Sequence, residues 1–534
     1  MKPNRTTSES RIDWGLTIFP LVAIGLLAAL LILFPENSAR VIESLRGFLV
    51  NDIGFVYIIF GLGVLLISLF IACSRWGKIR LGKLEKPRYS NFSWGTMIFT
   101  STMAADILYW ALIEWAYYFN ETPFAMEGMT LAQKQDWSSR YPLFHWGPIP
   151  WAFYILPAAA YGYMMYVKKS PKQRMSEACR PILGKKVDGV LGKAIDLFAV
   201  VGLLAATATT FSLATPLLSQ AVCSITGWNP SHVLTIGILV LIAVVFTLAV
   251  IFGIKGISKV ANICVFLFFA LLAVFLFGGP ARYIVETGVS AIGGVANNFL
   301  EMSTWMDPLR LSGDGVSGFP QNWTIFYWAY WISWAVATPF FIGKISEGRT
   351  IRQTILGAYI SGISATFTAF IVFGNYGLYQ QVTGKVDVAG QLAAGAAPSE
   401  AILSIFDTLP LSKVAIILLI LAMIAFYAST FDALTMVIAS YSVKNIKEGE
   451  EPSRKLRVFW SVVFIVLPIA LLFNDSTLSM LQTLSICAAL PIMVVIGLVI
   501  ASFIKNLRHH KEIEAEVSAT VPETADESPA SPDA

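Results

Sequence analysis

Aromatic side chains are concentrated in one segment of this sequence. Residues 323–335, WTIFYWAYWISWA, contain four tryptophans, two tyrosines and one phenylalanine. Because Trp and Tyr faces attract cations, with about 2 kcal/mol for each desolvated contact, rings that converge on one point could bind a quaternary ammonium group. Such a group has no N–H donors for ordinary hydrogen bonds. An anchoring belt at a membrane surface and a purely structural aromatic core are the alternatives. Four rings follow i, i+3, i+4, i+7 spacing and share one helix face: Tyr327, Tyr330, Trp331 and Trp334.

Two carboxylates lie in another apolar segment. Asp106 and Glu114 interrupt residues 104–119, AADILYWALIEWAYYF, and their separation of eight positions puts them on one helix face. A carboxylate inside a bilayer is costly unless it is paired, protonated or hydrated, so this face should point into the protein. Asp106 is the stronger functional candidate because it adjoins the small, polar residues 100–105. The alternative is that both carboxylates are structural.

Hydroxyl groups mark a third segment. Ser429, Thr430 and Asp432 interrupt a long apolar run. Helical hydroxyls commonly bond only to the i−4 carbonyl, but oxygens beside a carboxylate also suit a small hard cation such as sodium. The residues alone do not favour either interpretation. The small, polar residues 203–218 are explained by close helix packing.

These residues must be positioned by membrane-spanning helices. The chain has 534 residues, of which 56% are hydrophobic and 13% charged, against about 25% charged in soluble domains. About 20 apolar residues cross a bilayer, and the sequence predicts twelve spans. At 1.5 Å per residue, Trp334 would lie about 16 Å deep, which excludes a surface belt. The predicted spans are 14–34, 53–73, 94–119, 146–167, 192–222, 232–253, 260–279, 323–342, 353–380, 412–443, 457–473 and 479–504.

Loop charges predict the orientation. The loops after the second and fourth spans are rich in Lys and Arg, whereas the loop after the fifth has neither. The positive-inside rule therefore places both termini in the cytoplasm of a multi-pass protein of the cell (inner) membrane. Residues 283–305 form an amphipathic surface helix in this interpretation. The acidic residues from 506 to 534 are expected to be disordered.

Several function classes are disfavoured. The four histidines, residues 145, 232, 509 and 510, have no metal-site or catalytic-triad spacing, and no phosphate-binding G-x-x-x-x-G-K-[ST] loop occurs. We therefore expect neither an enzyme nor an organic cofactor, and no nucleic-acid partner. A channel or a non-transporting receptor remains a weaker alternative to a transporter.

Three motifs carry a family resemblance. NWTIFYWAYWISWA (322–335), FHWGPIPW (144–151) and GKISEGRTIR (343–352) resemble the betaine–choline–carnitine transporter family. The resemblance covers residues 14 to 505. It implies an all-α polytopic membrane protein with twelve transmembrane helices and leucine-transporter-like inverted five-helix repeats. It also implies alternating-access import of a choline-, glycine betaine- or carnitine-type compound, ion-coupled, with sodium-independent exchange as the alternative.

The resemblance also implies a division of the chain. Residues 1–13 are a cytoplasmic N-terminal tail and 14–92 hold two peripheral helices. Residues 93–280 and 322–505 form the two repeats, separated by an outer amphipathic helix and loop at 281–321, and 506–534 form the cytoplasmic tail. The family is often trimeric, so a homotrimer surrounded by membrane lipid is the expected assembly.

Site residues follow from the same motifs. The family's substrate cage corresponds to Tyr117, Tyr330, Trp331 and Trp334, and its pathway or neighbouring site to Trp146, Trp151 and Tyr154. The sodium site of coupled members corresponds to the hydroxyls of Ser429 and Thr430 and the carbonyls of Met103 and Phe426.

Two positions depart from the family pattern. Tyr330 replaces the first Trp of the final pair in the W-x-W-W pattern, and Asp106 replaces a glycine of betaine-specific sodium symporters. An aspartate here resembles the choline-type, often proton-coupled members. It could contact the substrate, carry the coupling proton, or do both. Sodium and protons both remain candidate coupling ions.

Overall fold

The computed structural model describes residues 12–101, 105–121, 123–126, 128–170, 172–251, 257–313, 315, 317–444, 452–473, 478–513 and 515. Within these ranges the protein is helical, and its extended pairing is limited to two isolated bridges, Ile12 with Val443 and Arg80 with Thr350. The prediction of an all-α protein is confirmed. Helices suit this composition because they satisfy every backbone polar group within one segment of chain.

Each predicted span coincides with one helix or with consecutive helices. Nine are single: α1 (Trp14–Leu33), α3 (Phe55–Cys73), α7 (Pro148–Tyr166), α10 (Val190–Thr226), α11 (His232–Ile251), α12 (Ile257–Gly278), α20 (Ser412–Tyr441), α21 (Arg454–Phe473) and α22 (Leu478–Arg508). Among the described helices, seven are long and apolar enough to cross a membrane, or up to nine if each of two bent pairs counts as one span. The chain is therefore a multi-pass membrane protein.

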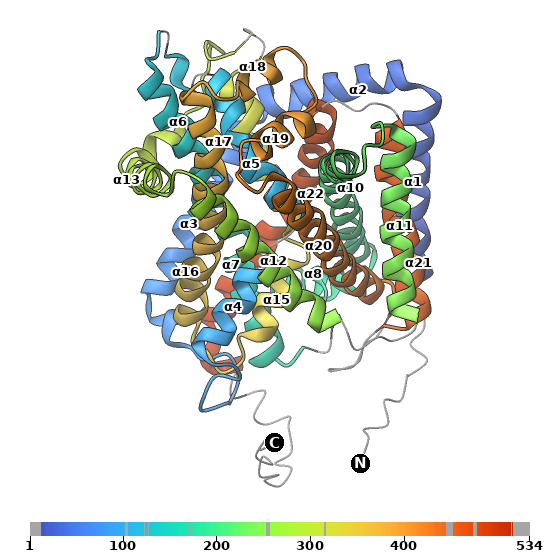
Figure 1. Ribbon diagram of the computed structural model, residues 1–534. Helices are drawn as coiled ribbons and strands as arrows, with labels where there is room; N and C mark the ends of the chain where they lie inside the picture. Colours follow the sequence, from blue (N-terminus) through green and yellow to red (C-terminus); the bar gives the residue numbers. More distant parts are fainter. Residues whose placement is uncertain are drawn as a thin grey trace, which may run out of the picture.

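The other three spans are divided. The third consists of α4 (Asn91–Ser101) and α5 (Ala105–Asn120), and the ninth of α16 (Ile351–Ala369), η6 (Phe370–Gly374) and α17 (Asn375–Val382). The eighth contains η5 (Pro320–Thr324), α14 (Ile325–Trp334) and α15 (Thr338–Ile345). Figure 1 shows α5 in the upper half of the molecule and α4 and α15 in the lower half.

The eighth predicted span, 323–342, is interrupted in the structure, and this break was not predicted. The helices on either side of residues 335–337 are bent by 56°. Pro339 lies in the first turn of α15, where its missing N–H costs nothing, so the sequence permits a new helix start here. At the bend, Ala335 and Ala337 donate to carbonyls only three positions earlier, so the regular helical hydrogen bonding is interrupted beside Trp334.

Other helices lie across the ends of the spans. α13 (Ala281–Thr304) is bent by 108° from α12, which confirms the predicted amphipathic helix. Its buried residues, among them Ile284, Gly288, Ala291 and Val295, share one face. α2 (Pro35–Gly47), which was not predicted, crosses the same end of the molecule (Figure 1).

Short helices fill the connections between the spans. α6 (Leu131–His145) begins with a capping box formed by Thr130 and Gln133 and packs on α13. The remaining elements are η1 (Phe48–Asp52), η2 (Arg75–Lys78), η3 (Pro123–Ala125), α8 (Met175–Ala178), α9 (Arg180–Leu183), η4 (Gly184–Asp188), α18 (Val388–Ala393) and α19 (Pro398–Phe406).

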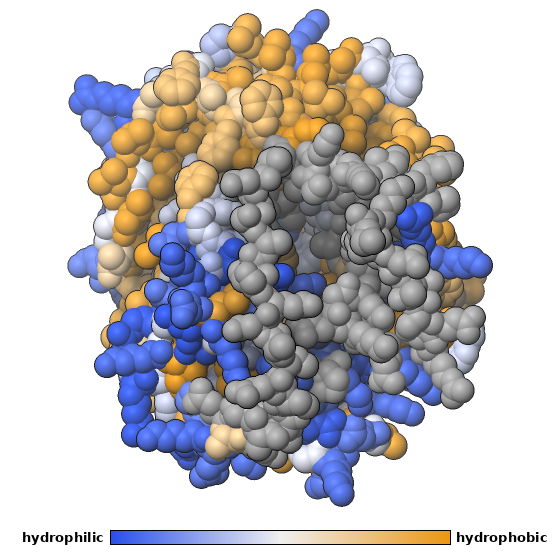
Figure 2. Space-filling view, turned by 90° about the horizontal axis from the view of Figure 1, so that it is seen from below, coloured by the Kyte–Doolittle hydropathy of each residue, from blue (hydrophilic) through white to orange (hydrophobic). Residues whose placement is uncertain are grey.

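Both ends of the described chain lie at the same end of the molecule. Asp13 donates its backbone N–H to Ser442, and the Arg174 guanidinium lies 3.9 Å from the Asp13 carboxylate. Lys168, in the same basic loop, contacts Asn506 at the end of α22. Figure 2 views this end and shows hydrophilic residues over its lower part and hydrophobic residues along its upper part. The termini and this basic loop therefore share a side, as predicted, and its assignment to the cytoplasm remains a prediction.

Candidate functional site

A cluster of rings surrounds Trp331 on α14. The Trp331 ring lies 4.9 Å from Tyr154, 5.3 Å from Trp146 and 5.5 Å from Trp151, measured between ring centroids. All four side chains are buried. α7 supplies Trp151 and Tyr154, and Trp146 immediately precedes it. The structure thus brings FHWGPIPW and the tryptophan-rich segment together. We call Trp146, Trp151, Tyr154 and Trp331 the aromatic cluster.

The rings of the aromatic cluster contact one another directly. A cation is attracted to an aromatic face within about 6 Å of its centroid. The Trp331 ring is inclined by 43° to Tyr154, by 69° to Trp146 and by 58° to Trp151, so none of these pairs is stacked face to face. Rings inclined in this way can present their faces to one cation.

Asp106 lies at the start of α5 and is bonded to α14. The Tyr330 hydroxyl donates to Asp106 Oδ2 at 2.5 Å, and the same hydroxyl lies 2.5 Å from Thr210 Oγ1 on α10. The two departures from the family pattern therefore contact each other. Thr210 had been explained by close packing alone, and its bond to Tyr330 was not predicted.

The Asp106 carboxylate has no ion-pair partner in the described part of the chain, and the side chain is 6% exposed. It interacts electrostatically with Tyr154, which is a member of the aromatic cluster. A buried carboxylate without a counter-ion is costly in a membrane. The site can therefore bind a cation that has an apolar surface, which would neutralise Asp106 while contacting the rings.

Three other predicted cage residues lie apart from the cluster or at its edge. Tyr117 packs on Trp323, with centroids 4.9 Å apart, and has no ring contact with Trp331 among the described residues. Tyr327 contacts Trp146 at 5.9 Å and stacks on His145 at 4.7 Å. Trp334 is half-buried at the last turn of α14, next to the bend. A substrate role for these three residues stays a prediction.

The predicted sodium site is described only in part. Ser429 and Thr430 are half-buried in the middle of α20, and Phe426 is buried one turn earlier. α20 packs against α12, α10 and α5. Met103 lies outside the described residues, as does the side chain of Asp432. Sodium binding by these residues stays a prediction.

Glu114 belongs to a hydrogen-bonded group that was not predicted. Its carboxylate accepts from the Tyr118 hydroxyl at 2.7 Å and from Trp146 Nε1 at 2.8 Å. His145 Nδ1 lies 2.8 Å from the Tyr118 oxygen and 3.4 Å from Glu114 Oε1. The sequence indicated that Glu114 is buried. Glu114 and His145 are 31 positions apart in the sequence, so spacing along one helix does not predict their pairing.

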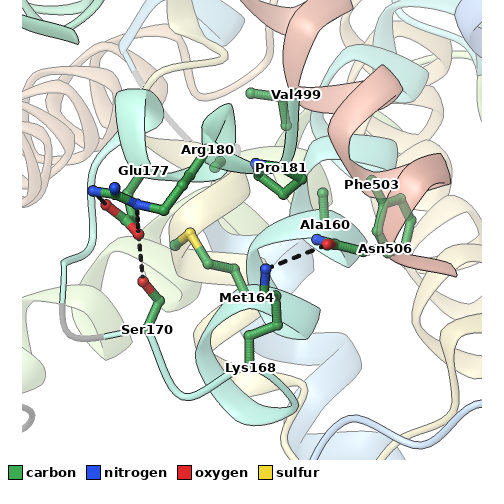
Figure 3. A pocket seen from close by; sticks show the side chains of 11 residues that line it. Ala160, Met164, Lys168, Ser170, Glu177, Arg180, Pro181, Val499, Phe503 and Asn506 are labelled. Carbon is green, nitrogen blue, oxygen red and sulfur yellow. Dashed lines mark hydrogen bonds and ion pairs between the residues drawn. The ribbon is translucent and has the colours of Figure 1, made fainter. Parts of the chain in front are cut away.

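A separate pocket lies at the C-terminal ends of α7 and α22 (Figure 3). Met164, Lys168 and Phe503 contribute to its walls. Its volume of about 30 Å³ accommodates roughly one water molecule, not a quaternary ammonium compound. The Arg180 guanidinium at its edge already pairs with Glu177 and with Asp188, whose pKa it lowers. This pocket is therefore distinct from the aromatic cluster.

Comparison with known proteins gives consistent matches. The model for the "BCCT, betaine/carnitine/choline family transporter" matches residues 15–512. A "Probable glycine betaine transporter" of Desulfitobacterium hafniense is 32% identical over 91% of this chain and 96% of that protein. The "Uncharacterized transporter YeaV" of Escherichia coli is 31% identical over 85% and 94%. A "Carnitine transporter" of Acinetobacter baumannii is 28% identical over 91% and 87%.

Proposed function

Since this chain belongs to the betaine/carnitine/choline transporter family, we propose that it imports a choline-like quaternary ammonium cation by ion-coupled alternating access. Family membership makes it a secondary transporter of a small quaternary ammonium compound. The choice among substrates rests on Asp106, the buried carboxylate beside the aromatic cluster that has no ion pair among the described residues.

The charge of Asp106 favours a cation over a zwitterion. Glycine betaine and carnitine carry a carboxylate, which an ionised Asp106 would repel. A choline-like cation would neutralise Asp106 and retain the ring contacts of the aromatic cluster. The relatives named for glycine betaine and carnitine support the alternative that a zwitterion binds when Asp106 is protonated.

The two substrate types predict opposite effects of pH. A proton and a choline-like cation compete for Asp106, so the apparent affinity for the cation falls as the pH falls. A zwitterion needs the protonated carboxyl, so its apparent affinity rises as the pH falls. By linkage, the first case releases a proton on binding and the second takes one up.

The coupling of transport to an ion gradient is proposed from the hydroxyls of α20 and from Asp106. Ser429 and Thr430 on α20 support sodium coupling, because hydroxyl oxygens suit a hard cation. Asp106 supports proton coupling. Sodium-independent exchange of substrate for product is the alternative, and family resemblance supports a homotrimer in the cell inner membrane with cytoplasmic termini.

The test is uptake of labelled choline, glycine betaine and carnitine by purified protein in liposomes. Each is measured with an inward sodium gradient, with potassium replacing sodium, and with a proton gradient alone. We expect choline uptake that depends on one of the two gradients. Uptake of glycine betaine or carnitine without choline uptake would overturn the substrate assignment. Uptake that depends only on internal substrate would establish exchange.

A further inference from the structure

A fully buried histidine connects three elements beside the aromatic cluster. His145, the last residue of α6, has its Nδ1 2.8 Å from the Tyr118 hydroxyl of α5 and its Nε2 3.1 Å from Thr324 Oγ1 in η5. Glu114, also fully buried, is 3.4 Å from Nδ1. The function proposed above uses neither Glu114 nor His145.

The hydrogen-bond directions assign one proton of the imidazole. When Glu114 is ionised, the Tyr118 hydroxyl donates its proton to it, so toward His145 its oxygen can only accept. Nδ1 therefore carries a hydrogen. Nε2 faces the Thr324 hydroxyl, which can donate or accept. Neutral His145 accepts from Thr324, and protonated His145 donates to it, so rotation of one hydroxyl satisfies both states.

Glu114 balances the added charge. Trp146 Nε1 and Tyr118 each donate to one of its oxygens, an arrangement that suits an ionised carboxylate. With His145 protonated, the pair is neutral overall. With His145 neutral, one negative charge remains next to Trp146, which contacts Trp331 at 5.3 Å in the aromatic cluster.

Within the part of the chain that the structure describes, no carboxylate other than Glu114 lies within ion-pair distance of His145. α5 contributes Glu114 and Tyr118, α6 contributes Tyr141, and α14 contributes Tyr327. Phe144, Phe319 and Trp328 complete the ring contacts and do not titrate. The charged side chains farther from His145 contact other residues.

Those distant charges lie on α5, α6 and α13. Glu121 accepts from Trp323 Nε1 at 2.7 Å, and Arg140 lies over the Trp137 ring. Glu301 of α13 interacts with Tyr141. Among the described residues, Glu114 is therefore the only carboxylate within ion-pair distance of His145.

We propose that His145, paired with Glu114, is a second proton-binding site, separate from Asp106, and that its protonation weakens binding of the cationic substrate. This effect on binding rests on the function proposed above. Loss of the proton exposes the negative charge of Glu114 at the wall of the aromatic cluster and favours a cation there. Protonation removes that attraction.

The test measures choline binding between pH 5 and pH 8, by tryptophan fluorescence of the purified protein, in two substitutions at Thr324. Thr324→Ser keeps a hydroxyl opposite Nε2 and should retain the wild-type pH dependence. Thr324→Val leaves a protonated Nε2 without an acceptor and should reduce the change in Kd across this range to the part that is due to Asp106. Equal pH dependence in the two variants would overturn the proposal.

Two further variants separate this site from Asp106. Asp106→Asn should retain a pH-dependent Kd, and adding His145→Gln should remove that dependence. His232→Gln, at an exposed histidine at the start of α11, is the control and should change nothing. A flat pH profile in Asp106→Asn alone would assign all protonation to Asp106 and overturn the proposal.

A spectroscopic measurement tests the proton site even if choline is not the substrate or a variant no longer binds it. Infrared difference spectra of the substrate-free protein across the same pH range should contain an imidazole signal that His145→Gln removes and Asp106→Asn retains. If the wild-type protein binds no choline, the proposed substrate is wrong, and this signal still tests the proton site. Its absence from the wild-type spectra would overturn the proposal.

Discussion

Replacing Trp331 by alanine tests the aromatic cluster directly. Its ring is 3% exposed and contacts three rings of the cluster, at 4.9, 5.3 and 5.5 Å. Alanine would remove the central π surface and leave Asp106 and Tyr330 in place. We therefore expect loss of ring contacts to the substrate while the charge of the site remains.

The expected magnitude comes from one desolvated contact. A cation–π contact contributes about 2 kcal/mol when it is desolvated, so Kd should rise about 30-fold. If both faces of the indole contact the substrate, binding falls below detection. The same substitution should destabilise the protein by about 3–5 kcal/mol, the usual cost of truncating a buried tryptophan.

A control must therefore separate affinity from stability. Trp460 on α21 is fully buried. Its Nε1 donates to Ser442 Oγ at 2.8 Å, at the C-terminal end of α20. Trp460→Ala should lose comparable stability and retain the wild-type Kd. Kd is measured with labelled choline on detergent-purified protein, and stability by thermal unfolding of the same samples.

The reasoning fails if Trp331→Ala binds choline as tightly as the wild type, because the ring would then lie outside the site. It also fails if both alanine variants lose affinity equally, because the loss would then reflect general destabilisation. Trp331→Phe, which retains a smaller π face, should lie between the wild type and the alanine variant.

The remaining predictions concern charge and ion binding. Asp106→Asn should weaken choline uptake at pH 8 more than at pH 5, since only the ionised carboxylate attracts the cation; equal loss at both values would make Asp106 structural. Thr430→Val should raise the sodium concentration for half-maximal uptake about tenfold or more if its hydroxyl is a ligand, through loss of about 1.5–3 kcal/mol, and an unchanged value would exclude it. Asp307, in the loop between α13 and η5, is buried, which raises its pKa, but bonds from Ser312 and Leu311 lower that pKa below its ordinary value overall. The ionised Asp307 carboxylate stabilises the fold at neutral pH, and this stabilisation is lost as the pH falls through the lowered pKa. Asp307→Asn should therefore destabilise the protein by about 1–3 kcal/mol at pH 7 and much less at pH 3. Chemical unfolding at the two pH values measures this difference.

The sequence alone determined where the membrane-spanning helices lie and that the carboxylates within them are buried. Long apolar runs are sufficient to predict helices in a membrane, because a helix is the structure in which one segment forms all its own backbone hydrogen bonds. Each predicted span coincides with described helices, and the buried position of Asp106 and Glu114 followed from the cost of a charge in lipid. The aromatic segment and its helix face were likewise visible, because helical spacing is a local property.

Tertiary structure decided which of these residues meet. Sequence spacing cannot place the Tyr330 hydroxyl on both Asp106 and Thr210, or Glu114 beside His145, because these contacts join different helices. Likewise, the packing of α5 and η5 decides that Tyr117 contacts Trp323 rather than Trp331. The bend after Trp334 had a local signal in Pro339, yet its 56° angle depends on how α15 packs on α7. Helical periodicity determines a face, and only packing between helices determines its partner.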